Sequence, residues 1–251
     1  MTDFSYQLYS SRNFTPISDT LTMLSGLGYA EVEGYGALFD NAATVDELIA
    51  NLGDSGLKMP TAHMSISMVE NKPERVLEIA GALGIKTVFA PYLVAEDRPT
   101  DADGWRAFGK RLEVAGKPLR DAGIAFGWHN HDFEFVALPT GELPIDLLFE
   151  TAPSLKWEAD IAWIVRGGQN PLDYIAKYGD RLTSAHIKDI APEGEKADED
   201  GWADVGDGTM DWPAIMAALR NTKVETFIME HDNPSDDGRF AERSLKAAQQ
   251  F

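Results

Sequence analysis

Helix-like stretches that end at a glycine alternate with short apolar stretches along the first third of the chain. Gly28, Gly56 and Gly84 lie 28 residues apart, and each follows apolar positions that recur with helical spacing. Glycine is favoured just past the end of a helix because it adopts the left-handed backbone conformation without strain. The spacing therefore predicts three consecutive units of helix, turn and strand.

The same order continues to the end of the chain. A fourth unit ends at Gly123, and helical stretches at 171–177 and 212–219 separate the later apolar runs. The pattern predicts eight strands, at 4–9, 30–35, 59–65, 87–93, 124–131, 155–163, 182–188 and 225–231. Strands that alternate with helices pair in parallel within one sheet.

Eight such units in 251 residues predict an α/β fold, a (β/α)8 TIM barrel that occupies residues 1–251 as a single domain. A doubly wound open sheet is the alternative. No glycine-rich phosphate-binding motif follows a predicted strand, which disfavours a nucleotide-binding sheet. The acidic segment 193–207 is the longest predicted loop and a candidate lid.

Composition narrows the class of function. The chain has 22 Lys and Arg against 41 Asp and Glu, a net charge of −19, and no cysteine. Without cysteine there is no disulfide, thiolate nucleophile or Cys-ligated zinc, and a strongly acidic chain is a poor partner for nucleic acid. No apolar run reaches the roughly 20 residues of a membrane helix. With no targeting segment visible, we expect a cytoplasmic protein.

Residues able to do chemistry gather where the predicted strands end. The five histidines all lie on or just after a predicted strand: His63, His129, His131, His186 and His231. Carboxylates accompany them: Glu33, Glu134, Asp160 and Glu230. In a barrel of this type the active site forms at the carboxyl ends of the strands. Any one of these histidines alone is more simply explained by packing, but their joint position predicts a site.

The segment 128–134 is the densest part of that predicted site. Side chains alternate along a strand, so His129 and His131 face the same way, and Glu134 follows in the loop. Asp160 is an acid within an otherwise apolar run, which is costly unless it is paired or bound to metal. Carboxylate and imidazole ligands suit Mn, Co, Zn, Fe or Mg, so the last four strands predict a metal site.

Two further features suit a substrate. Lys188 lies two residues past His186 on the same face and can hold an oxyanion or polarise a carbonyl. Aromatic side chains near the predicted mouth either pack or offer flat surfaces for a sugar ring. We expect Tyr6, Glu33, His63, Trp163 and Trp202 to contact the substrate.

These motifs resemble those of the sugar phosphate isomerase/epimerase superfamily of xylose isomerase-like TIM barrels, over essentially the whole chain. The resemblance is carried by YQLYS at 6–10, WHNHDFEF at 128–135, WEADIAW at 157–163, HIKD at 186–189, VGDGTMDW at 205–212 and MEHD at 229–232. It implies one divalent metal ion, with manganese favoured, held by a Glu, an Asp, a His and a Glu from four successive strands.

Asp160, His186 and Glu230 match the last three of those ligands. Many relatives carry a Glu in the fifth strand where this chain has His129, so Glu134 is the favoured first ligand, with His129 and His131 as alternatives. Trp163 stands where related ketose epimerases carry a substrate-binding His. This departure favours the His-Asn-His subgroup, which resembles enzymes of keto-sugars, keto-inositols and 3-keto-glycosides.

The resemblance implies removal of a proton next to a carbonyl, through an enediolate. His129 or His131 takes the proton, Lys188 steadies the charge, and Glu230 is both a ligand and a second acid/base. We expect a sugar isomerase or epimerase; the alternative is a lyase or dehydratase that eliminates a β-substituent. A DNA-repair endonuclease and a non-enzymatic sugar-binding protein fit less well. Few Lys or Arg residues flank the predicted mouth of the barrel, so we expect the substrate to be an unphosphorylated carbohydrate. A homo-oligomer is a possible assembly of the chain.

Overall fold

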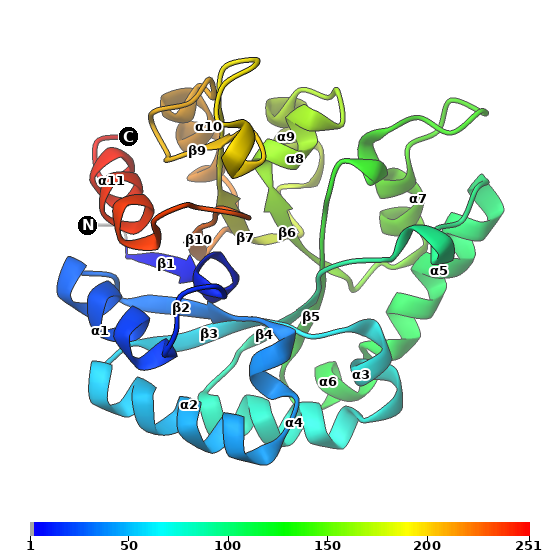
Figure 1. The fold of residues 1–251 in the computed structure, drawn as a ribbon. Coiled ribbons are helices and arrows are strands. Elements are labelled where there is room, and N and C mark those ends of the chain that lie inside the picture. Colours follow the sequence, from blue (N-terminus) through cyan, green and yellow to red (C-terminus); the bar gives the residue numbers. More distant parts are fainter. Residues whose placement is uncertain (1–2) are drawn as a thin grey trace.

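Eight parallel strands close into a barrel, as expected from the repeating units. The computed structural model describes residues 3–251, and the strand order around the barrel is β1-β10-β7-β6-β5-β4-β3-β2 (Figure 1). The strands are β1 (Phe4–Gln7), β2 (Glu31–Gly34), β3 (Lys58–His63), β4 (Thr87–Ala90), β5 (Ala125–His129), β6 (Lys156–Asp160), β7 (Leu182–Ile187) and β10 (Thr226–Met229). The predicted (β/α)8 barrel is thus confirmed, and the doubly wound sheet is wrong.

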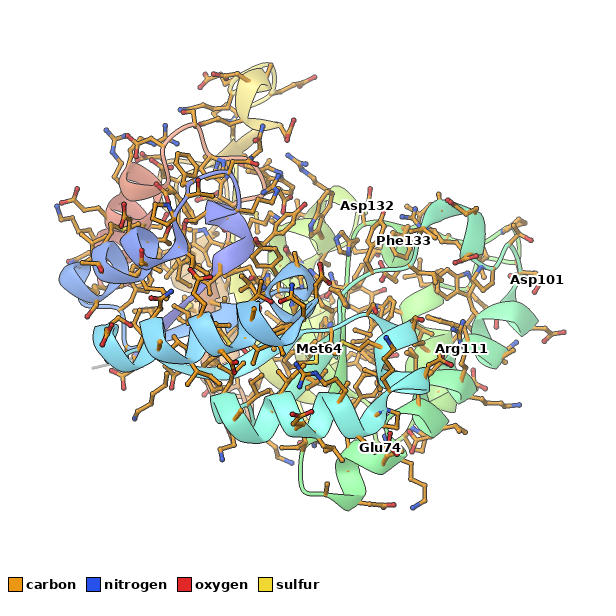
Figure 2. All side chains as sticks on the ribbon, turned by 60° about the horizontal axis from the view of Figure 1, so that its bottom comes forward. Met64, Glu74, Asp101, Arg111, Asp132 and Phe133 are labelled. Carbon is orange, nitrogen blue, oxygen red and sulfur yellow. The ribbon has the colours of Figure 1, made fainter. Side chains whose placement is uncertain are left out.

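Helices cover the outside of this barrel (Figure 1). They are α1 (Ile17–Leu27), α2 (Ala42–Ser55), α3 (Ile66–Asn71), α4 (Pro73–Leu83), α5 (Ala102–Ala115), α6 (Lys117–Asp121), α7 (Pro144–Thr151), α8 (Ile161–Arg166), α9 (Pro171–Tyr178), α10 (Trp212–Leu219) and α11 (Asp237–Ala248). Figure 2 labels Arg111 on the outer side of α5, where its guanidinium pairs with Glu70 of α3. No helix among residues 3–251 is long and apolar enough to cross a membrane.

The glycine spacing marks helix ends, as predicted. Gly28, Gly56 and Gly84 follow the last residues of α1, α2 and α4, with φ angles of 97°, 74° and 75°. The amides of Gly84 and Ile85 both donate to the carbonyl of Ala80 at the helix end. Gly123, with φ 84°, precedes β5 in the same way. These turns return the chain to the amino-terminal end of the barrel.

The strands end earlier than the apolar pattern predicts, because polar side chains turn the backbone away from the sheet. Strand β6 stops at Asp160, whose carboxylate accepts from the amide of Trp163 and caps α8. Strand β1 stops at Gln7, whose side chain accepts from the amide of Tyr9. Such side-chain bonds satisfy amides that leave the sheet. Trp163 therefore lies on a helix rather than on a strand.

The predicted loop 193–207 carries a short strand of its own. Strand β9 (Trp202–Ala203) pairs antiparallel with β8 (Asp189–Ile190), which directly follows β7. The buried Asp189 carboxylate accepts from the amides of Gly206 and Met210 and from the indole of Trp212. These bonds tie the segment to the barrel rim.

The glycine turns give a direct test of the fold. Ala at Gly84 meets no neighbouring atom, so its only cost is the positive φ, and we expect Gly84→Ala to lower the free energy of unfolding by about 1–2 kcal/mol. Gly81 lies within α4 and is also unobstructed, so Gly81→Ala should raise it by about 0.5–1 kcal/mol. Urea denaturation measures both; equal effects of the two variants would contradict the left-handed turn.

Candidate active site

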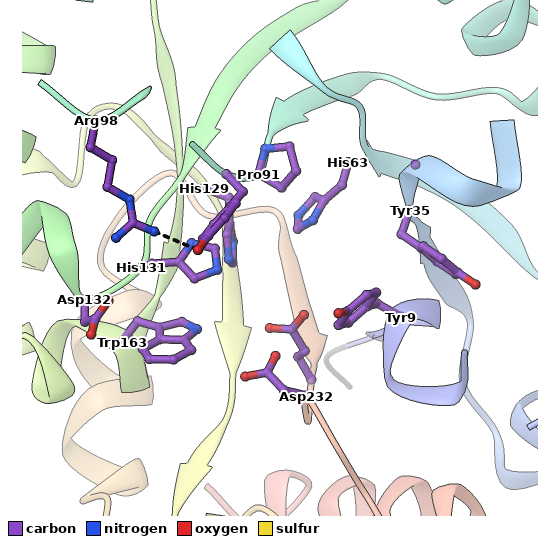
Figure 3. Close-up of a pocket in the computed structure, with 13 residues that line it drawn as sticks. Tyr9, Tyr35, His63, Pro91, Arg98, His129, His131, Asp132, Trp163 and Asp232 are labelled. Carbon is purple, nitrogen blue, oxygen red and sulfur yellow. Dashed lines mark hydrogen bonds between the residues drawn. The ribbon is translucent and has the colours of Figure 1, made fainter. Parts of the chain in front are cut away.

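A cavity of about 500 Å³ opens at the carboxyl ends of the strands (Figure 3). Five residues expected at the site line it: His63, His129, His131, Trp163 and Glu230. Arg98, His131 and Trp163 lie on one side of the cavity, and Tyr9 and Tyr35 lie on the other. Its size lies within the range typical of small-molecule sites.

Four ligand-type side chains converge at this end of the barrel. His129, Asp160, His186 and Glu230 come from β5, β6, β7 and the end of β10, and one ligand atom of each lies within 4.8 Å of the others. The Nδ1 atom of His186 lies 2.7 Å from Glu230 Oε2 and 3.9 Å from Asp160 Oδ2. All four are buried, and His129 Nδ1 makes no hydrogen bond within residues 3–251. This set of nitrogen and oxygen donors fits a divalent metal ion.

Glu134, the favoured first ligand, is not brought to Asp160, His186 and Glu230. Its Oε1 accepts from the indole of Trp128 at 2.7 Å, and its Oε2 accepts from the amide of His131 at 2.9 Å. Both carboxylate oxygens are thus used to shape the loop that follows β5. His129, which the sequence left as an alternative, stands with Asp160, His186 and Glu230 instead.

A residue to which the sequence assigned no role, Glu158, lies at the centre of a second group. The ligand atoms of His63, His129, Glu158 and His186 also lie within 4.8 Å of one another. Glu158 precedes Asp160 by two residues on β6, and alternation along a strand places both side chains toward the barrel interior. The spacing of two residues between Glu158 and Asp160 is the signal in the sequence that places both on one face of the strand.

Glu33 lies beside this second group rather than on the cavity wall. Its Oε1 lies 2.8 Å from His186 Nε2 and accepts from the side-chain amide of Gln7 at 2.8 Å. The two ring nitrogens of His186 therefore face different carboxylates, with Nδ1 toward Glu230 and Nε2 toward Glu33. A carboxylate on the second nitrogen fixes the orientation of a metal-binding histidine.

Lys188 is fully buried and surrounded by carboxylates. Its ammonium lies 2.7 Å from Asp232, 3.2 Å from Glu230 and 3.5 Å from Asp160. Burial lowers the pKa of Lys188, but Asp232, Glu230 and Asp160 outweigh this effect, and the net pKa is raised. Lys188 therefore keeps its positive charge. Its ammonium nitrogen lies 4.3 Å from the centroid of the Trp202 ring.

Two of the histidines that line the cavity, His129 and His131, are held neutral. Burial lowers the pKa of His131 well below its usual range, and His129 and Lys188 lower it further. Burial also lowers the pKa of His129 to about 3, with His186 adding to the effect. The imidazoles of His129 and His131 lie 5.1 Å apart. A neutral imidazole that lines a cavity can accept a proton.

Two expected substrate contacts are placed elsewhere by the structure. Tyr6 points to the outside of the barrel, where it packs on Tyr29 and Phe240 and its hydroxyl bonds to Ser11. The next residue on the strand, Gln7, points inward, as alternation requires. Trp202 is buried behind Trp163, and Arg166 stacks on it at 3.2 Å. The fifth histidine, His231, packs against Phe240.

Other cavity residues carried no recognisable sequence signal. Tyr92 follows β4, and its hydroxyl accepts from Arg98 at 2.7 Å; Arg98 also lies over the ring of Phe133. Asp232, the last residue of the motif at 229–232, was given no role and lines the cavity beside Lys188. Tyr92 and Arg98 lie in loops, where neither spacing nor periodicity fixes a side-chain position.

The chain belongs to the family described as xylose isomerase-like TIM barrel, whose model matches residues 24–251. The inosose dehydratase of Lacticaseibacillus casei is 27% identical over 172 residues, which are 61% of this chain and 56% of that protein. The chain thus spans about half the length of the curated relatives it matches.

Solved structures share the fold along the full chain. A sugar phosphate isomerase/epimerase from Parabacteroides distasonis has a TM-score of 0.82 at 21% identity, covering 98% of this chain and 94% of that one. The 3-keto-D-glucoside 4-epimerase of E. coli has a TM-score of 0.72 at 17% identity, with full coverage of both chains. The IOLI protein with a bound zinc atom has a TM-score of 0.72 at 16% identity, covering 99% and 96%. At these identities the likeness shows the fold alone.

The two acidic side chains Glu134 and Asp160 are distinguished by matched amide variants. Glu134→Gln turns one acceptor into a donor that faces an N–H group, and we expect the free energy of unfolding to fall by about 1–3 kcal/mol. Its Zn²⁺ affinity, measured by titration calorimetry, should stay within about twofold of wild type. Asp160→Asn keeps the helix cap but should weaken Zn²⁺ binding by at least about tenfold. The reverse ranking of the two affinities would make Glu134 the ligand.

Proposed function

We propose that this protein is a divalent-metal-dependent enzyme that removes a proton next to the carbonyl of a keto-sugar. The observation that carries the proposal is the placement of a neutral imidazole, His131, on the wall of a cavity that two members of the four-ligand group, His129 and Glu230, also line. A base, a set of metal ligands and a cavity of sugar size are the parts such a reaction requires.

His131 is the proposed general base. Its Nδ1 makes no hydrogen bond among the described residues, and aromatic rings of Tyr92, Phe133 and Trp163 surround it at 4.8–5.9 Å between ring centroids. These rings pack around the imidazole and fix its orientation. The base is therefore unprotonated and positioned before a substrate arrives.

His129, Asp160, His186 and Glu230 would hold the metal ion, and a bound divalent ion supplies a Lewis acid that polarises the substrate carbonyl. Lys188 keeps a fixed positive charge beside Asp160 and Glu230, which holds both carboxylates in place and favours developing negative charge on a bound substrate. Glu230 lines the cavity and is the proposed second acid/base. Manganese is the proposed ion.

The proposed substrate is an unphosphorylated keto-sugar. Among the described residues that line the cavity, Arg98 is the one Lys or Arg, and its guanidinium is engaged by Tyr92 and the carbonyl of Leu93. A phosphate group would find little free positive charge there. The name of the E. coli structure denotes a keto-glucoside substrate, in keeping with this proposal.

After proton removal, the reaction ends in one of two ways. Return of the proton gives isomerisation or epimerisation, the chemistry named for the similar structures. Loss of a β-hydroxyl gives a dehydratase, and the name of the curated relative favours this second candidate. The two share His131 and the metal ligands.

Solvent exchange tests the shared step and separates the outcomes. Enzyme loaded with Mn²⁺ is incubated with a 3-keto-glucoside or an inosose in D₂O and followed by proton NMR. Loss of the signal of the carbon-bound proton α to the carbonyl, without loss of a group, indicates an isomerase or epimerase. Loss of water with a new unsaturated carbonyl indicates a dehydratase. Exchange at the same rate after treatment with EDTA would contradict metal dependence.

The role of His131 is tested with a paired variant. His131→Gln should slow the exchange by about 10²- to 10⁴-fold, since it removes the general base. Tyr6→Phe removes a hydroxyl that bonds only within the core, so its exchange rate should stay near that of wild type. An unaffected His131→Gln enzyme, or an inactive Tyr6→Phe enzyme, would contradict these placements.

The pH dependence follows from the lowered pKa of His131. A general base works unprotonated, so activity is lost as the pH falls through its pKa. Because burial lowers that pKa, the acid limb of kcat/KM should lie below the ordinary histidine value of about 6.5. The profile is measured at saturating Mn²⁺ at each pH. A limb at or above pH 6.5 would exclude His131 in this environment.

A further inference from the structure

The second ligand group lies apart from the carboxylates of the first. It joins His63 at the end of β3 with Glu158 of β6, together with His129 and His186. His63 and Glu158 have no place in the proposed proton transfer. Both are buried, Glu158 completely, so water does not compensate the charge of its carboxylate.

The distances within this group suit a metal coordination shell. Glu158 Oε2 lies 2.5 Å from His63 Nε2 and 3.2 Å from His129 Nδ1. Ligand atoms bound to one tetrahedral zinc ion at about 2.0–2.1 Å lie about 3.3 Å apart. The 3.2 Å separation therefore matches that of two ligands on one ion, whereas the 2.5 Å contact between His63 and Glu158 would have to open by about 0.8 Å to admit one.

Unpartnered atoms point to a missing cation. His129 Nδ1 and Glu158 Oε1 are buried and make no hydrogen bond within residues 3–251. Oε2 of the neighbouring Glu33 is also buried and makes no hydrogen bond within residues 3–251. Buried polar atoms of native proteins are almost always satisfied, so each of these needs an explanation. A cation bound among these residues would take up His129 Nδ1 as a ligand and offset the charge of the Glu158 and Glu33 carboxylates.

The surrounding charge leads to the same conclusion. Five carboxylates lie in and beside the two groups: Glu33, Glu158, Asp160, Glu230 and Asp232. Among residues 3–251, Lys188 is the one Lys or Arg that forms an ion pair with any of them. One divalent ion and the ammonium leave an excess of negative charge in a buried place. Two divalent ions and the ammonium neutralise it. Protonation of His63 and His186 would supply the same two positive charges as a second ion. In that case the barrel would hold a single ion.

We propose that the barrel holds a second divalent-cation site, formed by His63, His129 and Glu158. His129 belongs to both ligand groups, so when the second site is filled it binds the second ion, and the first ion is left on Asp160, His186 and Glu230. Each ion then has three protein ligands, the number typical of an open zinc site. Between them, His186 turns Nδ1 to the first ion and keeps Nε2–H for Glu33. The richer share of imidazole makes the second site selective for Zn²⁺ over Mg²⁺.

Metal stoichiometry tests this proposal without any substrate. The purified chain is stripped with chelator, equilibrated with Zn²⁺ and freed of excess metal, and zinc per chain is measured by plasma mass spectrometry. We expect two ions in wild type and one in both Glu158→Gln and His63→Gln. Asp160→Asn should also retain one ion, at the second site. Glu31→Gln, the same change at the opposite end of strand β2 from the site, is the control and should retain two.

The outcomes separate this proposal from the proposed function. One ion in wild type that persists in Glu158→Gln and is lost in Asp160→Asn overturns the second site and leaves the first intact. Two ions in both Glu158→Gln and His63→Gln also overturn it. No ion in wild type overturns the first site as well. If Glu158→Gln fails to fold, as judged by circular dichroism, His63→Gln decides the result.

Discussion

The structure depends on five carboxylates that share the carboxyl end of the barrel with one ammonium, that of Lys188, as their Lys or Arg partner among the described residues. Asp160, Glu230 and Asp232 face Lys188, and Glu33 and Glu158 face the imidazole of His186. Such an arrangement is costly without further positive charge, and burial raises the pKa of Asp160 to about 7 despite Lys188. A bound metal ion would offset this cost by neutralising the carboxylates. Its position would also determine where a substrate carbonyl is polarised.

The barrel makes this concentration of charge possible because parallel strands bring their carboxyl ends to one place. Each strand supplies side chains of one parity to the interior, so Glu158 and Asp160 come from a single strand. The strand-end groups also terminate their own strands. Asp160 caps α8 with one oxygen and faces Lys188 with the other. Local backbone order and site chemistry are therefore coupled in the same residue.

The barrel fold could be predicted from the sequence because the patterns that specify it involve residues close together in the chain. Glycine turns such as Gly84 and the alternation of helical and apolar runs depend only on nearby residues. The site was readable only in part. Asp160, His186 and Glu230 were placed together, but Glu134 was drawn into the loop by Trp128, a contact no spacing reveals. Tyr6 was expected at the site but points outward, because its neighbour Gln7 takes the inward face of the strand. Glu158 was not expected there, although it shares the inward face with Asp160.

Anomalous diffraction at the zinc absorption edge, from crystals of the wild-type chain grown with Zn²⁺, tests the central claim most directly. The metal centre predicts an anomalous peak within bonding distance, about 2.0–2.2 Å, of Asp160, His186 and Glu230. A map without such a peak, in which His186 and Glu230 keep their direct 2.7 Å contact at saturating zinc, would contradict it. The buried carboxylates would then be balanced by protons, and metal-assisted proton abstraction would have no basis in this barrel.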